Sequence, residues 1–349
     1  MPVGEDNIPV DKKPVEYTLL NTDDTGASKY SFSYPSKEEG VSINAIAWEP
    51  PVADGSKPRG IVQIVHGMVE FIDRYDRYAK FLSHNGFIVV GNDHVGHGDS
   101  VISKDDWGYI PMDGGADILL SDIDTLRKIA QERYGEDLPY FIHGHSMGSF
   151  IVRSYISKRA EGLAGAIIEG TGNPAPSASK LGLMITSFLA KTRGEKYKSN
   201  MVNNMALGSY AKSVPNARTS CDWISRDETV VDTYMHEPRN QFMFTVSGYH
   251  ALMSLTAEVA QQSCVDRVPK DLPILIESGG EDPVGENGKA PTQLYDMCQK
   301  AGIWDVTLKI YEGARHEVHN ELNKEEFYND NLAWLVDHLG GQGAEKNGD

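Results

Sequence analysis

The sequence has few cysteines, and they are not spaced as a disulfide framework or a structural zinc site requires. Cys221, Cys264 and Cys298 are odd in number and lie far apart in the chain. We therefore expect three ordinary thiols. No residue pattern indicates a metal site or a bound cofactor, so the sequence predicts chemistry carried out by side chains alone.

Long apolar runs and an excess of basic residues are also lacking. No uninterrupted apolar stretch approaches the length that crosses a bilayer, and residues 1–6 (MPVGED) have neither the basic nor the apolar region of a secretory signal. These absences predict a cytoplasmic protein. The 33 basic residues against 50 acidic ones give a net charge of −17, which opposes binding to nucleic acid as the main activity.

Short apolar runs separated by helix-length segments dominate the chain from residue 60 onward. Apolar strands that alternate with helices predict an α/β fold, with a parallel sheet covered on both faces. The runs are at residues 61–65, 87–90, 138–143, 164–168, 274–276 and 306–311. An alternating pattern at 30–34 and 42–48 predicts a hairpin at the sheet edge, and residues 327–339 predict a closing helix.

One region interrupts this alternation, because residues 173–267 contain predicted helices, such as 181–190 and 240–259, and no strand of the core type. A helical cap over the strand ends accounts for it. The predicted organisation is an extension with little structure (1–28), the first part of the core (29–172), the cap (173–267), the second part of the core (268–340) and a flexible tail (341–349).

An apolar run in the predicted cap begins at Leu181 and is flanked by basic residues. Such a stripe more commonly packs onto a core, and contact with a lipid surface is the alternative. The flanking residues are Lys180, Lys191, Arg193, Lys196 and Lys198.

The residues from Gly144 to Gly148 (GHSMG) lie between a predicted strand and a predicted helix. This context is typical of a nucleophile elbow, in which a strained serine stands clear of the sheet and glycines two residues away avoid a collision. The serine is Ser146. It needs a base to take its proton, and a histidine suits that role near neutral pH. His316, after the last strand, is the first choice, and His319 is the second.

The histidine in turn needs an acid to orient it and to stabilise its charged form. Asp282 follows a core strand and gives the chain order serine, aspartate, histidine that hydrolases of this fold use. Glu281 and Glu169 are the rival acids.

Backbone N–H groups must receive the oxyanion that forms when a serine attacks a carbonyl. The N–H of Met147 follows the nucleophile, and the N–H of Met68 follows the first core strand, so we expect these two donors to form the oxyanion hole. Glu70 and the pair Arg74 and Tyr75 are expected to brace that loop. Local backbone hydrogen bonds are expected for Asp93, His94 and His97.

Five ordered motifs resemble one known family. They are HGM at 66–68, DHVGHGDS at 93–100, GHSMG at 144–148, GEDPV at 280–284 and GARHE at 313–317. Together they resemble the α/β-hydrolase fold family, and within it the monoacylglycerol lipase and lysophospholipase group, which is classed with the serine aminopeptidase S33-type hydrolases. The resemblance spans about residues 42–339.

The resemblance implies the triad Ser146, Asp282 and His316, oxyanion N–H groups at Met68 and Met147, and a helical cap. Residues 223–227 and 242–248 are similar to the cap of bacterial members. Two features depart from the family: Phe71 stands where a histidine is common, and the polar N-terminal segment is long.

The sequence therefore predicts a serine hydrolase that cleaves carboxylic esters through an acyl-enzyme. The expected substrate is a small acyl ester or a monoacyl lipid, such as a monoacylglycerol or a lysophospholipid. A peptidase or amidase of the same fold is one alternative, although iminopeptidase-type members carry glycine and proline where this chain has Met68 and Val69. A ligand-binding protein on a hydrolase fold is the other.

Overall fold

The computed structural model describes residues 15–51 and 57–340, and their strands form one nine-stranded sheet. The first 14 residues of the predicted extension and the predicted tail at 341–349 lie outside this part of the chain. From one edge to the other the strands are β1 (Thr18–Thr22), β2 (Ser28–Pro35), β3 (Ser42–Glu49), β5 (Phe87–Asn92), β4 (Gly60–Val65), β6 (Tyr140–His145), β7 (Gly165–Glu169), β8 (Ile274–Gly279) and β9 (Val306–Tyr311).

The six strands from β5 to β9 are parallel, and β1, β2 and β3 add an antiparallel edge. The alternation of apolar runs and helices predicted this α/β architecture correctly, and the hairpin predicted at 30–34 and 42–48 is the β2–β3 pair.

Strand β1 corrects the prediction that residues up to 28 have little structure. Thr18–Thr22 pairs with β2, and Thr18 aligns with Ser31. All five residues of β1 are exposed, including Leu19 and Leu20, so the strand has no buried face to impose an alternating pattern on its sequence. The backbone ladder with β2 holds this edge strand, and side-chain hydrophobicity gives no signal for it.

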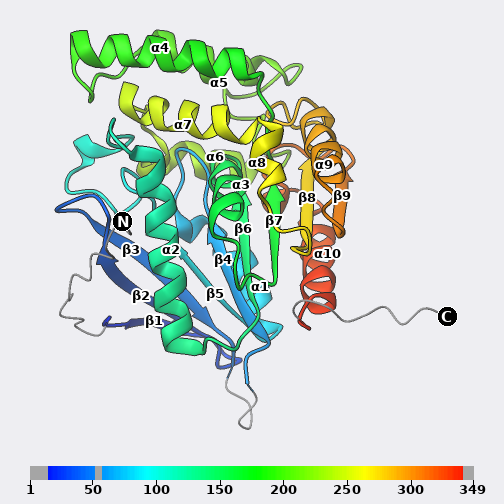
Figure 1. Ribbon diagram of the computed structural model, residues 1–349. Helices are drawn as coiled ribbons and strands as arrows, with labels where there is room; N and C mark the ends of the chain where they lie inside the picture. The colour runs from blue at the N-terminus through cyan, green and yellow to red at the C-terminus, as the bar shows by residue number, and fades with distance from the viewer. Residues whose placement is uncertain (1–14, 52–56, 341–349) are drawn as a thin grey trace, which may run out of the picture.

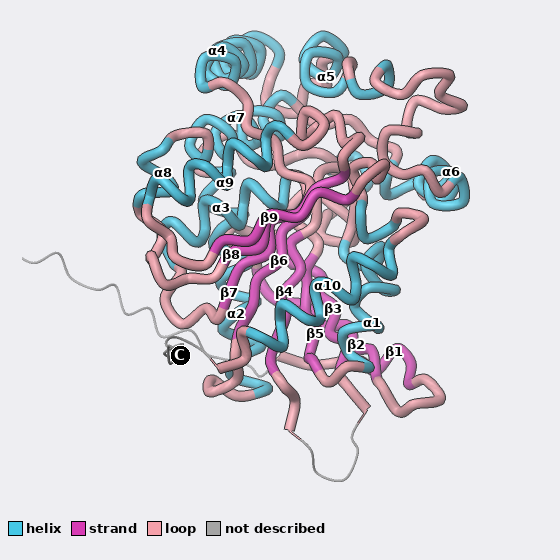
Figure 2. Tube along the Cα trace, turned by 90° about the vertical axis from the view of Figure 1, so that its right-hand side faces the viewer, coloured by secondary structure: helices cyan, strands magenta, loops and turns pink. Residues whose placement is uncertain are grey.

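Helices cover both faces of the sheet (Figures 1 and 2). Successive residues of β4 enter different cores: Ile61 and Val65 join one buried cluster, and Val62 and Ile64 join the other. The first cluster packs against α2 (Gly115–Tyr134), α3 (Met147–Arg159), α8 (Gln262–Asp266) and α9 (Lys289–Ala301); the second packs against α1 (Asp76–His84) and α10 (Lys324–Asp337).

Helices α4 (Pro176–Arg193), α5 (Asn200–Leu207), α6 (Glu228–His236) and α7 (Val246–Val259) all come between β7 and β8 in the chain. Figure 1 shows α4 and α5 as the outermost layer, above α7 and beyond the carboxyl ends of the strands. The helix predicted from residue 240 begins at Val246, because the Thr245 hydroxyl accepts a hydrogen bond from the Gly248 N–H and caps the helix there.

Five short 3₁₀ helices complete the structure: η1 (Ile72–Tyr75), η2 (Lys104–Asp106), η3 (Tyr210–Lys212), η4 (Pro238–Asn240) and η5 (Val318–Asn320). Within residues 15–51 and 57–340, no helix is both long enough and apolar enough to span a membrane.

Candidate active site

Ser146 stands at the turn between β6 and α3 with a backbone φ of 53°, in the left-handed region that serine rarely occupies. Its two flanking positions must be glycine, because any side chain there would collide with neighbouring backbone atoms. A Cβ on Gly144 would lie 2.4 Å from the carbonyl oxygen of Gly148, and one on Gly148 would lie 1.9 Å from that of Val65. The sequence GHSMG thus permits a tight strand-to-helix turn, which presents the serine hydroxyl above the sheet.

The side chains of Ser146, His316 and Asp282 form one hydrogen-bonded chain. Ser146 Oγ lies 2.9 Å from His316 Nε2, and His316 Nδ1 lies 3.0 Å from Asp282 Oδ1. Asp282 is fully buried, and its Oδ1 also accepts a hydrogen bond from the Val284 N–H. The carboxylate therefore favours a proton on Nδ1, which leaves Nε2 free to accept the serine proton.

The rival residues that the sequence left open lie in other arrangements. His319 Nδ1 is 2.8 Å from Glu169 Oε1, and Glu169 Oε2 is 3.0 Å from His143 Nε2. Glu281 is exposed to solvent. The structure thus brings His316 to Ser146, while His319 and Glu169 pair with each other.

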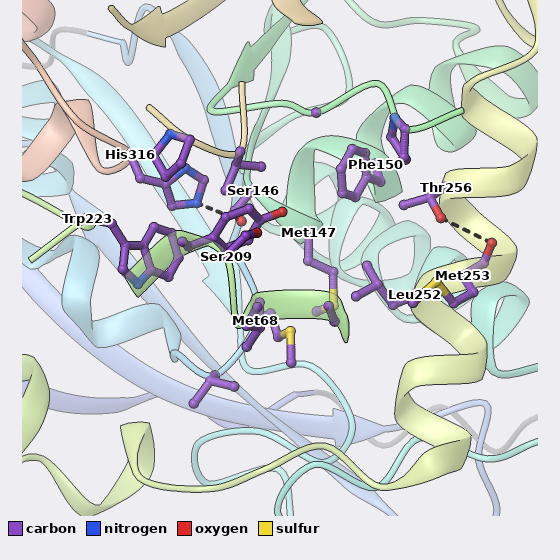
Figure 3. Close-up of a pocket in the computed structure, with 18 of the residues that line it drawn as sticks. Met68, Ser146, Met147, Phe150, Ser209, Trp223, Leu252, Met253, Thr256 and His316 are labelled. Carbon is purple, nitrogen blue, oxygen red and sulfur yellow. Dashed lines mark hydrogen bonds between the residues drawn. The ribbon is translucent and has the colours of Figure 1, made fainter. Parts of the chain in front are cut away.

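The loop after β4 passes close to the serine. The backbone at Gly67 approaches the serine closely, because a Cβ on Gly67 would lie 2.9 Å from Ser146 Cβ. Met68 is the next residue in this loop. Met147 is the first residue of α3, and its N–H has no acceptor within the helix. Figure 3 shows the side chains of Met68 and Met147 beside the same cavity as Ser146. The oxyanion role of their N–H groups stays a prediction.

Buried charges brace this loop. The Glu70 carboxylate accepts a hydrogen bond from the Gly67 N–H, and the Arg74 guanidinium donates to Glu70 at 2.7 Å and to both oxygens of Glu317 at 2.8 Å. Burial alone would raise the pKa of Glu70, but the neighbouring His145 and Arg74 hold this pKa well below its usual value. Glu70 is therefore an anion that fixes the loop backbone, as the sequence predicted.

A buried network of histidines and glutamates lies behind the triad, and the sequence analysis did not identify it. His145 Nδ1 lies 3.1 Å from Glu70, and its Nε2 lies 3.4 Å from the His316 carbonyl oxygen. Burial opposes the charge of His145, yet the carboxylates of Glu169 and Glu70 outweigh burial and raise its pKa. These contacts cross 75 to 171 residues of sequence, so no local pattern could reveal them.

Within the described parts of the chain, His145, Glu169 and His319 form the one group of potential metal ligands that lie close together, with ligand atoms within 4.8 Å of one another. All three side chains are buried. Both ring nitrogens of His145, both carboxylate oxygens of Glu169 and the Nδ1 of His319 already take part in the hydrogen bonds described above. The buried Nε2 of His319 has no hydrogen-bond partner among the described residues.

A second histidine cluster lies beneath the loop after β4. His66 Nε2 accepts a hydrogen bond from the His94 N–H, and His97 Nδ1 donates to the Val95 carbonyl oxygen. Asp93 accepts hydrogen bonds from the backbone of Ile72 and Asp99. The predicted bonds to local backbone are therefore present for His97 and, through Asp99, for Asp93. The His94 ring instead bonds the His66 carbonyl oxygen, 28 residues away on the neighbouring strand end.

Ser146 opens into a cavity of about 520 Å³, a volume typical of small-molecule sites. Figure 3 shows His316 and Trp223 on one side of Ser146, and Phe150, Leu252, Met253 and Thr256 on the other. The Trp223 ring lies 5.1 Å from the His316 ring between centroids, and this contact was also beyond local sequence reasoning.

Known proteins with related sequences are hydrolases. A family model described as serine aminopeptidase, S33, matches residues 56–323. The chain is 28% identical to a monoacylglycerol lipase of Mycolicibacterium smegmatis over 86% of this chain and 95% of that protein. It is also 28% identical to the monoglyceride lipase of Homo sapiens, over 79% of this chain and 80% of that protein.

A solved structure of similar fold is a carboxyl esterase from Bacillus coagulans in complex with glycerol. It aligns with a TM-score of 0.82 and 31% sequence identity, and the alignment covers 89% of this chain and 99% of that one. A lipase in an open form aligns with a TM-score of 0.79 and 26% identity.

Proposed function

The chain belongs to the serine aminopeptidase S33 family and is an ester hydrolase of the α/β-hydrolase type, and we propose that Ser146, His316 and Asp282 are its catalytic triad. The observation that carries this assignment is the hydrogen-bonded chain from Ser146 Oγ through His316 to Asp282, with distances of 2.9 and 3.0 Å.

Acylation begins when Ser146 Oγ attacks the ester carbonyl carbon and His316 Nε2 takes the serine proton. The carbonyl π bond opens, and the N–H groups of Met68 and Met147 stabilise the negative oxygen. The tetrahedral intermediate then collapses. His316 gives its proton to the departing alcohol oxygen, and the acyl group stays on Ser146.

Deacylation repeats these steps with water. His316 removes a proton from a water molecule as its oxygen attacks the acyl carbon, and then returns a proton to Ser146 Oγ. The fatty acid leaves as a carboxylic acid, which ionises near neutral pH. Asp282 stabilises the charged imidazolium in both half-reactions and remains ionised throughout.

The proposed substrate is a monoacyl lipid, such as a monoacylglycerol or a lysophospholipid, or a simpler acyl ester. The cavity supports this class because methionine, leucine and phenylalanine side chains form much of its wall. The named relatives include monoacylglycerol lipases and a carboxyl esterase.

The outer face of α4 supports a further part of the proposal, in which the cap rests on a lipid surface. One side of α4 faces outward, where Met184 is 71% and Phe188 66% exposed. On the other side Ser179 and Thr186 are buried, and Ile185 and Leu189 pack against the core. The expectation that the apolar run packs onto the core thus applies to one side of the helix. Exposed Lys180, Lys191, Arg193 and Lys198 surround this face and suit phospholipid headgroups.

Steady-state hydrolysis of p-nitrophenyl butyrate and of a monoacylglycerol tests the triad. We expect turnover by the wild type, no turnover above background by Ser146→Ala, and normal turnover by Ser263→Ala, which changes an exposed serine on α8. Full activity of Ser146→Ala would contradict the mechanism. Faster cleavage of p-nitroanilides than of the matching esters would favour a peptidase or amidase.

A further inference from the structure

The cavity extends from Ser146 in two directions of different character (Figure 3). On the His316 side lies the Trp223 ring, 5.1 Å from the His316 ring between centroids. On the other side the wall is formed by Phe150, Leu252 and other apolar side chains. Because His316 protonates the departing alcohol, the alcohol fits the first side and the acyl chain fits the second.

Between α4 and α7, two hydroxyl groups form part of the wall of this second side. Ser179 on α4 and Thr256 on α7 are 2% and 5% exposed, and their hydroxyl oxygens lie 3.0 Å apart. The Thr256 hydroxyl donates to the Met253 carbonyl oxygen at 3.2 Å, which leaves Ser179 to donate to Thr256. Both protons are therefore used within the wall, and neither is available to a ligand.

Met253 and Gly182 belong to the same part of the wall, on α7 and α4. A Cβ on Gly182 would be 2.9 Å from Met253 Sδ and 3.0 Å from Met253 Cγ. Any side chain at position 182 must therefore displace the methionine, and both residues line the cavity. Gly182 lies in the interior of α4, where glycine is less favourable than alanine. The space that its missing side chain leaves is occupied by Met253.

We propose that Gly182, Met253 and Thr256 determine the longest acyl chain that the enzyme accepts, with the methyl end of an alkyl chain lying against them between α4 and α7. This inference rests on the proposed function and specifies the substrate of the same site. The flexible Met253 side chain is the adjustable part of the wall, and the Ser179–Thr256 pair is the fixed part.

The test measures kcat/KM for p-nitrophenyl esters from acetate to palmitate. Gly182→Leu introduces a side chain that pushes Met253 into the cavity. We expect kcat/KM for the longest accepted chain to fall by about 10-fold or more, since one methylene in an apolar pocket is worth about 10- to 200-fold. Met253→Ala should move the optimum to longer chains. Acetate does not reach this wall, so its kcat/KM should change by less than about 2-fold.

Ser177→Leu is the matched control, because it adds the same side chain to an exposed position of α4 and should leave the chain-length profile unchanged. An unchanged profile in both Gly182→Leu and Met253→Ala, with acetate still cleaved, would overturn the inference and leave the proposed function intact. If Gly182→Leu does not fold, Met253→Ala decides alone. Failure of the wild type to cleave any ester would instead refute the proposed function.

Discussion

At the scale of single residues, Asp282 was predicted from its place in the chain, and its environment explains its proposed role. It is fully buried and accepts hydrogen bonds from His316 and from the Val284 N–H. Asp282→Asn keeps the shape of the side chain, but the amide can stabilise the His316 tautomer that lacks a proton on Nδ1. We expect kcat to fall about 10⁴-fold.

Steady-state ester hydrolysis measures this loss, and Glu281→Gln is the control, because Glu281 is adjacent in sequence and exposed. It should retain normal kcat. An unchanged rate in Asp282→Asn, with inactivity in Glu281→Gln or Glu169→Gln, would transfer the role of the acid to that glutamate.

His97 provides a pH prediction. Burial, with a contribution from His94, lowers its pKa from 6.5 to about 3, so between these values the unfolded chain binds a proton that the folded chain does not. The free energy of unfolding therefore decreases as pH falls through this window, by about 1.4 kcal/mol per pH unit for this group. Above pH 6.5 this contribution to stability is fully present.

Urea unfolding across this window, for the wild type and His97→Asn, measures the difference. The asparagine amide can still donate to the Val95 carbonyl oxygen but does not titrate. The variant should lose stability less steeply as the solution is acidified. If the free energy of unfolding falls equally steeply with pH in the two proteins, His97 does not titrate as its burial implies.

Sequence reasoning could identify single residues where the chemistry sits in a local pattern. Ser146 lies in a turn that sterics define, and Asp282 and His316 directly follow core strands. His145, Trp223 and Glu317 could not be assigned partners, because their contacts come from segments that only the folded chain brings together.

At the scale of elements, buried strands were easy to predict and the exposed edge strand was not. Strands β4 and β6 are buried along their whole length and contain short apolar runs, whereas β1 is exposed throughout. The start of α7 was also misplaced, because its cap at Thr245 depends on one hydroxyl and not on apolar periodicity.

Arg153 on α3 joins both ends of the cap segment to the core. It is 3% exposed and donates hydrogen bonds to the carbonyl oxygens of Gly172, where the chain enters the cap, and of Val259, at the end of α7, each at 2.8 Å. Arg153→Met would leave these buried acceptors unpaired. We expect the free energy of unfolding to fall by about 3 kcal/mol.

Chemical denaturation measures this change. Lys158→Met is the control, because Lys158 lies on the same helix, is 36% exposed and forms an ion pair with Glu258 that should contribute less than about 1 kcal/mol. Equal losses in the two variants would mean that Arg153 has no special role at the base of the cap.

At the scale of the whole molecule, the sequence located the helical cap between two core strands, but it could not show which side of α4 faces outward. The protein carries a net charge of −17, yet the outer face of α4 combines apolar side chains with exposed lysines and Arg193. This local charge is what allows the cap to approach a lipid surface in our proposal.

Met184→Ser with Phe188→Ser tests that contact. Since burying one such side chain is worth about 1.5–3 kcal/mol, the double variant should lose about 10-fold or more in activity on a monoacylglycerol held in phosphatidylcholine vesicles. Its activity on dissolved p-nitrophenyl butyrate should be unchanged.

Trp304→Ser is the control for this test, because Trp304 is 79% exposed and precedes β9, at the end of the sheet opposite the cap. It should leave both activities unchanged. An equal loss on dissolved and vesicle-bound substrate in the cap variant would argue against contact with lipid.

The most direct test of the central claim, that Ser146 forms the acyl-enzyme, is intact-mass analysis after reaction with a fluorophosphonate, followed by peptide mapping. The account predicts a single adduct on Ser146, loss of ester hydrolysis in step with labelling, and no adduct on Ser146→Ala. An adduct on another residue, or continued hydrolysis by fully labelled protein, would contradict it.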